Sequence, residues 1–209
     1  KCLEKYGKTP IALFDQYGVW ERGGQAAHCV WVSDEDMEIM ARKGITAIHN
    51  PYSNLKLGSG VARVPVLSRA GVNIALGTDG VSSHNSTDLF ADMKLAAILH
   101  NGVGCDPMAV TAPQALAMAT VNGAKALRRN TGVIAPGKMA DLILVDFTAP
   151  NLIPCHDPAE NLVFSAYGSN VVMNMARGKI IYENGTFLTL DLEKIRAEVK
   201  DYALPKIFG

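Results

Sequence analysis

Short apolar runs alternate with amphipathic stretches over residues 1–129 of this chain of 209 residues. Three of the runs, at residues 25–30, 46–49 and 72–76, have the length of buried strands and end in polar residues. Apolar residues recur at helical spacing in the segments between them. This alternation predicts an α/β fold with a parallel sheet, because continuous apolar strands are buried on both faces in such sheets.

Capping residues predict where several helices begin and end. Ser33, followed three positions later by Asp36, resembles a capping box, and Gly44 ends the helix that this box opens. Two longer helices are predicted over residues 87–100 and 111–128. The second of them has proline in its first turn, where the missing backbone N–H costs nothing.

Beyond residue 131 the pattern becomes typical of an antiparallel sheet. Strands are predicted at residues 141–145, 171–176 and 179–182. Asn184-Gly185 follows the last of these strands and favours a tight hairpin turn, since both residues tolerate positive φ angles. The chain therefore changes from α/β to β structure near this point.

These patterns divide the chain into three parts. Residues 1–130 form the α/β part, residues 131–190 form a sheet-rich part, and residues 191–209 form a C-terminal tail. In the tail, Leu192 and Ile195 begin a series of apolar residues at helical spacing. The tail is therefore predicted to pack as a final helix.

Three parallel strands are too few to close a barrel, which needs eight strands and about 200 residues before any appendage. The sheet is therefore either an open three-stranded layer or the C-terminal part of a larger α/β barrel. Residues 72–76 read as buried on both faces, although the chain offers few partners to cover them. We therefore expect exposed apolar surface and self-association into a homo-oligomer.

Composition excludes some classes of partner. The 20 basic and 20 acidic side chains cancel, so the chain lacks the basic excess that nucleic acids and anionic membranes attract. Apolar stretches such as residues 142–145 are far shorter than the roughly 20 residues that cross a bilayer, and residues 1–5 precede no apolar signal region. The expectation is a cytoplasmic protein with neither nucleic acid nor membrane as partner.

The four cysteines show no C-x-x-C spacing, which argues against a zinc knuckle or a redox motif. We expect them to be reduced. Cys29 lies within the apolar run 26–30 and is predicted to be a small buried side chain rather than a reactive thiol.

Polar residues follow the three predicted strands, at the edge where α/β proteins place their chemistry. They are His28, His49 and Asp79. A lone histidine in such a place is more often a hydrogen-bonded core residue than a ligand, and the alternative for Asp79 is a carboxylate that caps the following turn. Three such residues at neighbouring strand ends favour a site. Because an ionised carboxylate is costly to bury alone, the favoured arrangement is a metal site with Asp79 as ligand and His28 as ligand or proton shuttle.

Two polar segments lie close to these strand ends. Residues 53–60 suit either a loop that closes over a substrate or a simple exposed connection. Lys56 in this segment lacks the sequence context of a phosphate loop, which excludes a nucleoside triphosphate site. Residues 82–86 offer hydroxyl groups just beyond Asp79, although part of this run is needed to cap the next helix.

Three motifs in chain order carry a specific resemblance to a known family. They are Ala27-His28-Cys29-Val30, then His49-Asn50-Pro51 with Ser53-Asn54-Leu55-Lys56-Leu57-Gly58, then Leu76-Gly77-Thr78-Asp79-Gly80. Together they resemble the C-terminal half of an amidohydrolase-superfamily enzyme. The nearest branch is the chlorohydrolase and aminohydrolase group, which contains 5-methylthioadenosine/S-adenosylhomocysteine deaminases, guanine deaminases and triazine hydrolases. Residues 132–142 resemble the family's return from its barrel into a small β-sandwich.

The resemblance implies a (β/α)8, or TIM, barrel with a divalent metal, zinc or iron, that activates water for attack on a heterocyclic substrate. Asp79 on the eighth barrel strand would bind the metal and accept a proton from the water. His28 on the sixth strand would contact or orient the water. Ser83 would contact the substrate or Asp79, and His49 and Asn54 would lie near the substrate.

Other ligands of the family do not occur in these residues. The family has an H-x-H pair on strand one and a histidine on strand five, followed by an H-x-x-E glutamate, whereas the histidines here are His28, His49, His84, His100 and His156. The resemblance thus implies barrel strands six to eight and the C-terminal portion of the β-sandwich, with the N-terminal half of the barrel as a missing partner.

The function that the resemblance implies is hydrolytic deamination of a purine nucleoside or a related heterocycle. With one Asp and one His, the isolated chain is expected to bind metal weakly or not at all and to be inactive. The alternative is a non-catalytic oligomerisation or binding module with vestigial site residues.

Overall fold

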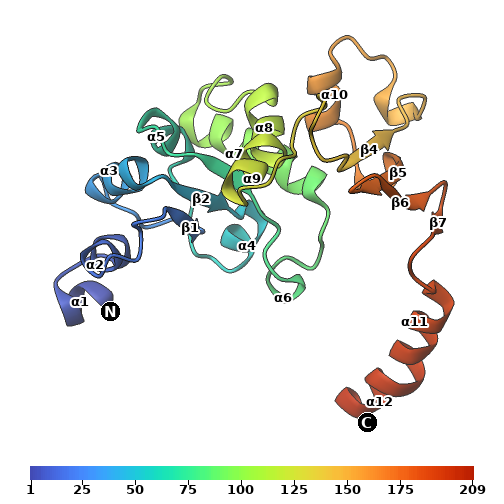
Figure 1. Ribbon diagram of the computed structural model, residues 1–209, viewed down its shortest axis with the longest axis horizontal. Coiled ribbons are helices and arrows are strands. Elements are labelled where there is room, and N and C mark those ends of the chain that lie inside the picture. Colours follow the sequence, from blue (N-terminus) through green and yellow to red (C-terminus); the bar gives the residue numbers. More distant parts are fainter.

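The computed structural model describes residues 1–209 and arranges them around two separate sheets (Figure 1). The first sheet has three parallel strands in the order β1–β2–β3, and the second has four antiparallel strands in the order β4–β5–β6–β7. The strands are β1 (Gly24–Ala27), β2 (Ile45–His49), β3 (Ile74–Leu76), β4 (Leu142–Val145), β5 (Val171–Ala176), β6 (Lys179–Glu183) and β7 (Thr186–Phe187). The α/β class predicted for the first part of the chain is confirmed.

Helices fill the connections of the parallel sheet and flank the second sheet (Figure 1). Around the first sheet they are α1 (Cys2–Tyr6), α2 (Pro10–Gln16), α3 (Asp34–Lys43), α4 (Pro51–Lys56), α5 (Val64–Arg69), α6 (Val81–His84), α7 (Leu89–Gly104), α8 (Ala112–Ala119) and α9 (Val121–Ala126). Later come η1 (Pro150–Leu152), α10 (Pro158–Phe164), η2 (Gly168–Asn170), α11 (Leu192–Glu198), η3 (Val199–Ala203) and α12 (Leu204–Phe208). None of these helices combines the length and the apolar composition that a membrane-spanning helix needs.

Helix α3 has the boundaries that its sequence predicts. The Ser33 hydroxyl accepts a hydrogen bond from the Asp36 backbone N–H at 3.1 Å, and the Asp36 carboxylate accepts one from the Ser33 N–H at 3.0 Å. Gly44 ends the helix with φ of 66°, in the left-handed region that favours glycine. Met37 and Met40 of α3 are buried in the core. The helix therefore begins and ends where its capping residues predict, and it buries the apolar face that its sequence pattern predicts.

The core lies between the parallel sheet and the helices packed on it. Ala47 of β2 and Ile74 of β3 share it with Leu67 of α5 and Ala115 of α8. Ile74 and Ala75 are only 3% and 1% exposed, because α5, α7, α8 and α9 all contact β3. The expectation that residues 72–76 lack cover is therefore wrong.

Strand β1 is shorter than the sequence pattern predicts. It ends at Ala27, because His28 and Cys29 adopt φ angles of 68° and 50°, outside the range of a strand. Cys29 is buried as predicted, and burial raises the pKa of its thiol to about 11. The turn at this point fixes the direction of the His28 side chain.

The first half of the segment at residues 53–60, expected as a loop, lies within helix α4, which ends at Lys56. Pro51 occupies the first turn, where its ring is compatible with a helix, and Asn50 precedes it. Ser53 and Asn54 are 0% and 2% exposed. The expectation of an exposed connection or a closing loop is therefore wrong for these two residues.

The helix predicted over residues 111–128 is divided into α8 and α9. Thr120 leaves the helical conformation, with φ of −127° and ψ of −94°, and its hydroxyl donates a hydrogen bond to the Leu116 carbonyl at 2.7 Å. This local hydrogen bond competes with the regular helical pattern. The chain changes direction there, and α9 packs against β3.

The sheet-rich part follows its prediction closely, whereas the tail does not. Asn184 and Gly185 connect β6 to β7 with φ angles of 45° and 85°, as a tight hairpin requires. The tail is helical as predicted, but α11 and α12 bury no residue, and Phe208 is 81% exposed. Figure 1 shows these helices extending away from both sheets. The expectation that the tail packs on the rest of the chain is wrong.

The accessible surface is large for a chain of this mass. It measures 12611 Å², whereas a compact monomer of 22.4 kDa has about 9,400 Å². Besides the tail, β1 contributes, because it is the outer strand of the order β1–β2–β3 and its residues Gln25 and Ala27 are exposed. Unpaired strand edges of this kind favour association with another strand.

We expect the chain to sediment as a dimer or larger species at tens of micromolar in analytical ultracentrifugation, because apolar surface and the β1 edge remain uncovered. Replacing an exposed edge residue with a charge, Ala27→Lys, should shift the distribution towards monomer. A compact monomer for the unmodified chain over this concentration range would contradict the expectation.

Candidate functional site

The polar residues that follow the parallel strands meet at one edge of the first sheet. His28 comes directly after β1, His49 ends β2, and Asp79 comes three residues after the end of β3. The structure brings His28 Nε2 to 3.9 Å from Asp79 Oδ2, with side chains 44% and 29% exposed. A carboxylate and an imidazole therefore share one solvent-accessible point at the carboxyl ends of the strands, where α/β proteins bind ligands.

The Asp79 carboxylate is held by two short hydrogen bonds. The Ser53 hydroxyl of α4 donates to Oδ2 at 2.6 Å, and the Gly80 backbone N–H donates to Oδ1 at 2.6 Å. These two bonds lower the pKa of Asp79 from its ordinary value, with a smaller contribution from the His28 charge and from Ser83. Asp79 thus caps the following turn through the Gly80 N–H, as the alternative interpretation expected. Its carboxylate is nevertheless ionised and accessible to solvent.

Hydrogen bonding also orients the His28 ring. Its Nδ1 lies 2.8 Å from Oδ1 of Asn54, and this shorter of its two contacts favours the tautomer with the proton on Nδ1. The Asn50 amide lies farther away, at 3.4 Å from the same nitrogen. This tautomer leaves the lone pair of Nε2 directed at the space beside Asp79. In this structure the contact of Asn54 with the site is therefore indirect, because its side chain orients the ring of His28.

The close approach of β2 and β3 at the site depends on a residue without a side chain. A Cβ atom on Gly77 would lie 2.5 Å from Oδ1 of Asn50 and 2.9 Å from Cγ2 of Ile48. Both distances are shorter than real contacts, and neither neighbour lies at the end of a long flexible chain. Gly77 therefore allows the turn that carries Asp79 to lie against the end of β2.

His49 lies behind the site in a buried histidine pair. Its side chain faces α7, where Nε2 lies 3.1 Å from Nε2 of His100. Burial, together with the charge of His100, lowers the pKa of His49 to about 3, and burial lowers the pKa of His100 to about 4. Both rings are neutral at pH 7, so one donates a hydrogen bond to the other. Contact between His49 and a substrate stays a prediction, and the structure gives the ring another partner.

Ser53 is the residue that the sequence did not single out for a role. It stands in the motif after His49-Asn50-Pro51, but only the three-dimensional position of α4 shows that the hydroxyl reaches Asp79. Ser83, which the sequence did single out, lies on α6 just beyond Asp79. The structure thus places a serine on each side of the carboxylate.

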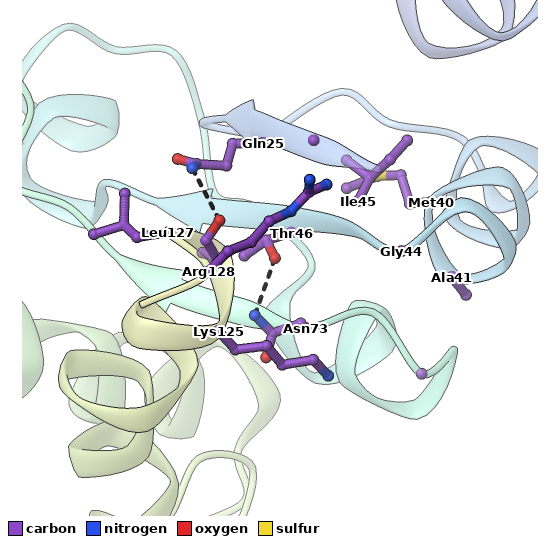
Figure 2. Close-up of a pocket in the computed structure, with 13 residues that line it drawn as sticks. Gln25, Met40, Ala41, Gly44, Ile45, Thr46, Asn73, Lys125, Leu127 and Arg128 are labelled. Carbon is purple, nitrogen blue, oxygen red and sulfur yellow. Dashed lines mark hydrogen bonds between the residues drawn. The ribbon is translucent and has the colours of Figure 1, made fainter. Parts of the chain in front are cut away.

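A cavity of about 490 Å³ lies elsewhere, at the opposite ends of the strands (Figure 2). Its neutral polar side chains have partners, since Gln25 donates to the Ala126 carbonyl at 3.1 Å and Asn73 donates to the Thr46 hydroxyl at 3.0 Å. Lys125 lies in the last turn of α9, an ordinary place for a cation because helix carbonyls point there. This cavity contains no carboxylate, histidine or cysteine, so it does not compete as a catalytic site.

The residues present can supply only part of a metal site. No three His, Cys, Asp or Glu side chains cluster anywhere in the chain, and zinc sites use three or four protein ligands. His28 Nε2 and Asp79 Oδ2 fit as two ligands of such a set, because both face the same point and both have their second polar atoms occupied. A complete site requires further ligands.

Comparison with known proteins identifies similar sequences along nearly the whole chain. Residues 2–181 match the amidohydrolase family. The chain is 46% identical over 200 residues to a 5'-deoxyadenosine deaminase of Methanosarcina mazei, covering 96% of this chain and 46% of that protein. It is 46% identical over 202 residues to a 5-methylthioadenosine/S-adenosylhomocysteine deaminase of Acetivibrio thermocellus, covering 96% of this chain and 47% of that protein. The chain thus spans about half the length of these relatives.

Solved structures show the same arrangement. A zinc-bound adenosine deaminase from Xanthomonas campestris superposes with a TM-score of 0.92 at 33% identity, covering 97% of this chain and 46% of that one. An atrazine chlorohydrolase from Arthrobacter aurescens, complexed with zinc, gives a TM-score of 0.89 at 27% identity, covering 96% of this chain and 45% of that one. Both structures contain zinc.

The buried histidine pair predicts how stability depends on pH. Unfolded histidine titrates near pH 6.5, whereas the pKa values of folded His49 and His100 are lower, so acid favours the unfolded chain. Between pH 7 and pH 5 each histidine should remove about 2 kcal/mol from the free energy of unfolding. In urea unfolding, the fall in the free energy of unfolding between pH 7 and pH 5 should be smaller for His100→Gln than for the unmodified chain by about 2 kcal/mol, the contribution of one histidine.

The exposed His156 provides the control, because His156→Gln should keep the pH dependence of the unmodified chain. Burial raises the pKa of Asp92 to about 6, so protonation of Asp92 stabilises the folded chain as the pH falls. This effect opposes that of the histidines, and it is the same in the unmodified chain and in both variants. Equal pH dependence in the unmodified chain and His100→Gln would contradict this account of the pair.

Proposed function

Because the chain belongs to the amidohydrolase family, we propose that its residues form part of a metal-dependent site for the hydrolytic deamination of a purine nucleoside. The observation that carries this proposal is the meeting of His28 and Asp79 at the carboxyl edge of the parallel sheet. The relatives named as deaminases of 5'-deoxyadenosine and of 5-methylthioadenosine/S-adenosylhomocysteine support a nucleoside substrate. The likeness to a chlorohydrolase supports a common reaction, hydrolytic displacement at a ring carbon.

The proposed fold of the whole protein is a (β/α)8 barrel with a small β-sandwich. In it, β1, β2 and β3 would be barrel strands six to eight, and the antiparallel sheet would be the C-terminal portion of the β-sandwich. The open edge of β1 supports this proposal, because a barrel strand needs a neighbour on both sides. So does the match to about half the length of the relatives. The remaining half of the barrel is then the partner that covers this edge.

A divalent metal, zinc or iron, would be held in part by Asp79 and in part by His28 or a water that His28 orients. When bound, such a metal lowers the pKa of water so that hydroxide forms near neutral pH. Two ligands do not make a tight site, so we propose that these residues alone bind the metal weakly and are inactive. The other ligands would come from the rest of the barrel.

Asp79 supplies the negative charge and the base. Its hydrogen bonds from Ser53 and Gly80 hold it ionised, as a metal ligand must be. Beyond its hydrogen bond each oxygen retains one further lone pair, so Oδ2 can face the metal while Oδ1 accepts a proton from the attacking water. Ser53 would hold the carboxylate in place during the transfer, because its hydroxyl donates to Oδ2.

His28 directs the water. With Nδ1 donating to Asn54, its Nε2 accepts a hydrogen bond from a water placed beside Asp79. Ser83 on α6 would contact the substrate or Asp79, and the exposed position of α6 beside the carboxylate supports either contact. In this proposal Asn54 is a positioning residue for His28 rather than a direct substrate ligand.

The second candidate function is a non-catalytic binding or oligomerisation module. The large exposed surface and the lack of a three-ligand cluster favour it. A module without catalysis would, however, gain nothing from an ionised Asp79 held by two hydrogen bonds beside an oriented histidine. Assays of deamination by the whole protein distinguish the two functions.

In the whole protein, with the rest of the barrel fused or co-expressed, Asp79→Asn should lower kcat/KM for nucleoside deamination by about 10² to 10⁴, because it removes the charge and the proton acceptor while keeping the side-chain size. If His28 orients the water rather than binding the metal, His28→Asn should leave metal bound and lower turnover. Ammonia release from methylthioadenosine, S-adenosylhomocysteine, adenosine and guanine, and chloride release from chlorotriazines, would be measured.

Asp146→Asn is the matched control, since Asp146 is also hydrogen-bonded, by Thr148, and lies outside the parallel sheet. It should retain the activity of the unmodified protein. Activity of Asp79→Asn close to normal would disprove the assignment of Asp79, and the absence of turnover with every substrate would favour the binding module.

A further inference from the structure

A second histidine–carboxylate pair lies near the site but takes no part in it. His84 Nε2, from α6, lies 2.9 Å from Asp92 Oδ2, from α7, and the two side chains are 2% and 0% exposed. The imidazole and the carboxylate face each other within hydrogen-bond distance, and the backbone of Tyr52 on α4 lies close enough to lower the pKa of Asp92. Buried polar groups are costly unless they are paired, so each of the two side chains depends on the other.

Helix α6 needs such a contact to hold its position. It has only four residues, too few to be stable alone, and its N-cap residue Gly80 makes no side-chain capping bond. Its remaining attachments lead to α4, because Lys56 Nζ donates to the Ser82 carbonyl at 3.0 Å and also to Asn85. The pair with Asp92 is the attachment of α6 to α7.

The same histidine also contacts α4. The ring of Tyr52 lies against the ring of His84, with centroids 4.5 Å apart. Tyr52 precedes Ser53, which donates to Asp79, and His84 follows Ser83 on the other side of that carboxylate. The cluster of Tyr52, His84 and Asp92 therefore connects the two helices that carry the serines nearest Asp79.

We propose that His84 and Asp92 are positioning residues, which fix α6 against α4 and α7 so that Ser83 faces Asp79 and α6 forms one wall of the substrate site. The exposed residues of α6, Val81 and Ser82, would then be the surface that a bound nucleoside meets. The part of this inference that concerns substrate rests on the proposed function. The part that concerns the position of α6 does not.

A simple contribution to core stability would have different consequences. Loss of the pair would then weaken the whole α/β part, because Asp92 is completely buried on the longest helix. A positioning role predicts instead that α6 loosens while the sheet keeps its stability. Local opening of this kind is measured by amide hydrogen exchange.

The first experiment uses the 209-residue chain and needs no activity. His84→Ala should raise the exchange rates of amides 83–85, which donate to backbone carbonyls, by about tenfold or more and leave those of β2 and α8 unchanged. His84→Gln should restore most of the protection, because its amide nitrogen can take the position of His84 Nε2 and donate a hydrogen bond to Asp92. His100→Ala, which removes another buried histidine facing α7, should leave amides 83–85 unchanged.

An increase in exchange spread over the whole α/β part, or no increase at residues 83–85, would overturn the proposal. So would a loss of protection in His84→Gln as large as in His84→Ala, since the contact to Asp92 would then not be what holds α6.

The second experiment uses the whole protein and a nucleoside substrate. His84→Ala should raise KM by about tenfold or more, with kcat within about threefold and the metal content unchanged, because α6 forms substrate contacts and holds no metal ligand. A fall in kcat that parallels metal loss would overturn the substrate part of the inference. If the unmodified protein deaminates no nucleoside, the proposed function fails, and with it the substrate part, while the exchange experiment still decides whether the pair positions α6.

Discussion

The Asp79 carboxylate is held in place by the Ser53 hydroxyl and the Gly80 backbone N–H, and the local structure of the site follows from these two bonds. The first requires a helix to begin immediately after β2, which Pro51 allows. The second requires Asp79 itself to adopt a φ of 58°, an uncommon conformation for a residue with a side chain. Such a conformation persists only where surrounding contacts support it, and it is a frequent mark of functional sites.

Helix α7 supports this arrangement from behind through two buried polar contacts. Asp92 near its start meets His84 of α6, and His100 near its end meets His49 of β2. The two contacts differ in charge, since the histidine pair is neutral at pH 7 whereas the other joins an acid to a base. Buried polar groups are costly unless they are paired, so both contacts specify one packing of α7 against the elements that carry the site.

Local sequence rules predicted the parallel strands, the α3 capping box and the Asn184-Gly185 turn, because a few neighbouring residues determine each of them. They failed where distant contacts decide. The polar residues after Pro51 resemble a loop, yet Ser53 and Asn54 form a buried helix because Asp79 and His28 supply their partners. The same rules placed His28 and Asp79 at strand ends, but only the folded chain shows that Ser53 reaches the carboxylate. The tail has the periodicity of a packed helix and remains exposed, since periodicity shows an apolar face without showing what covers it.

The proposed site depends on an Asp79 carboxylate that hydrogen bonds keep ionised, and carbon-13 NMR of the labelled aspartate side chains measures its pKa directly. Titration of the chain should give Asp79 a pKa below its ordinary value, and Ser53→Ala should raise that pKa, because the Ser53 bond is the largest cause of the shift. An Asp79 that titrates at or above the ordinary value, or that is unaffected by Ser53→Ala, would contradict the account.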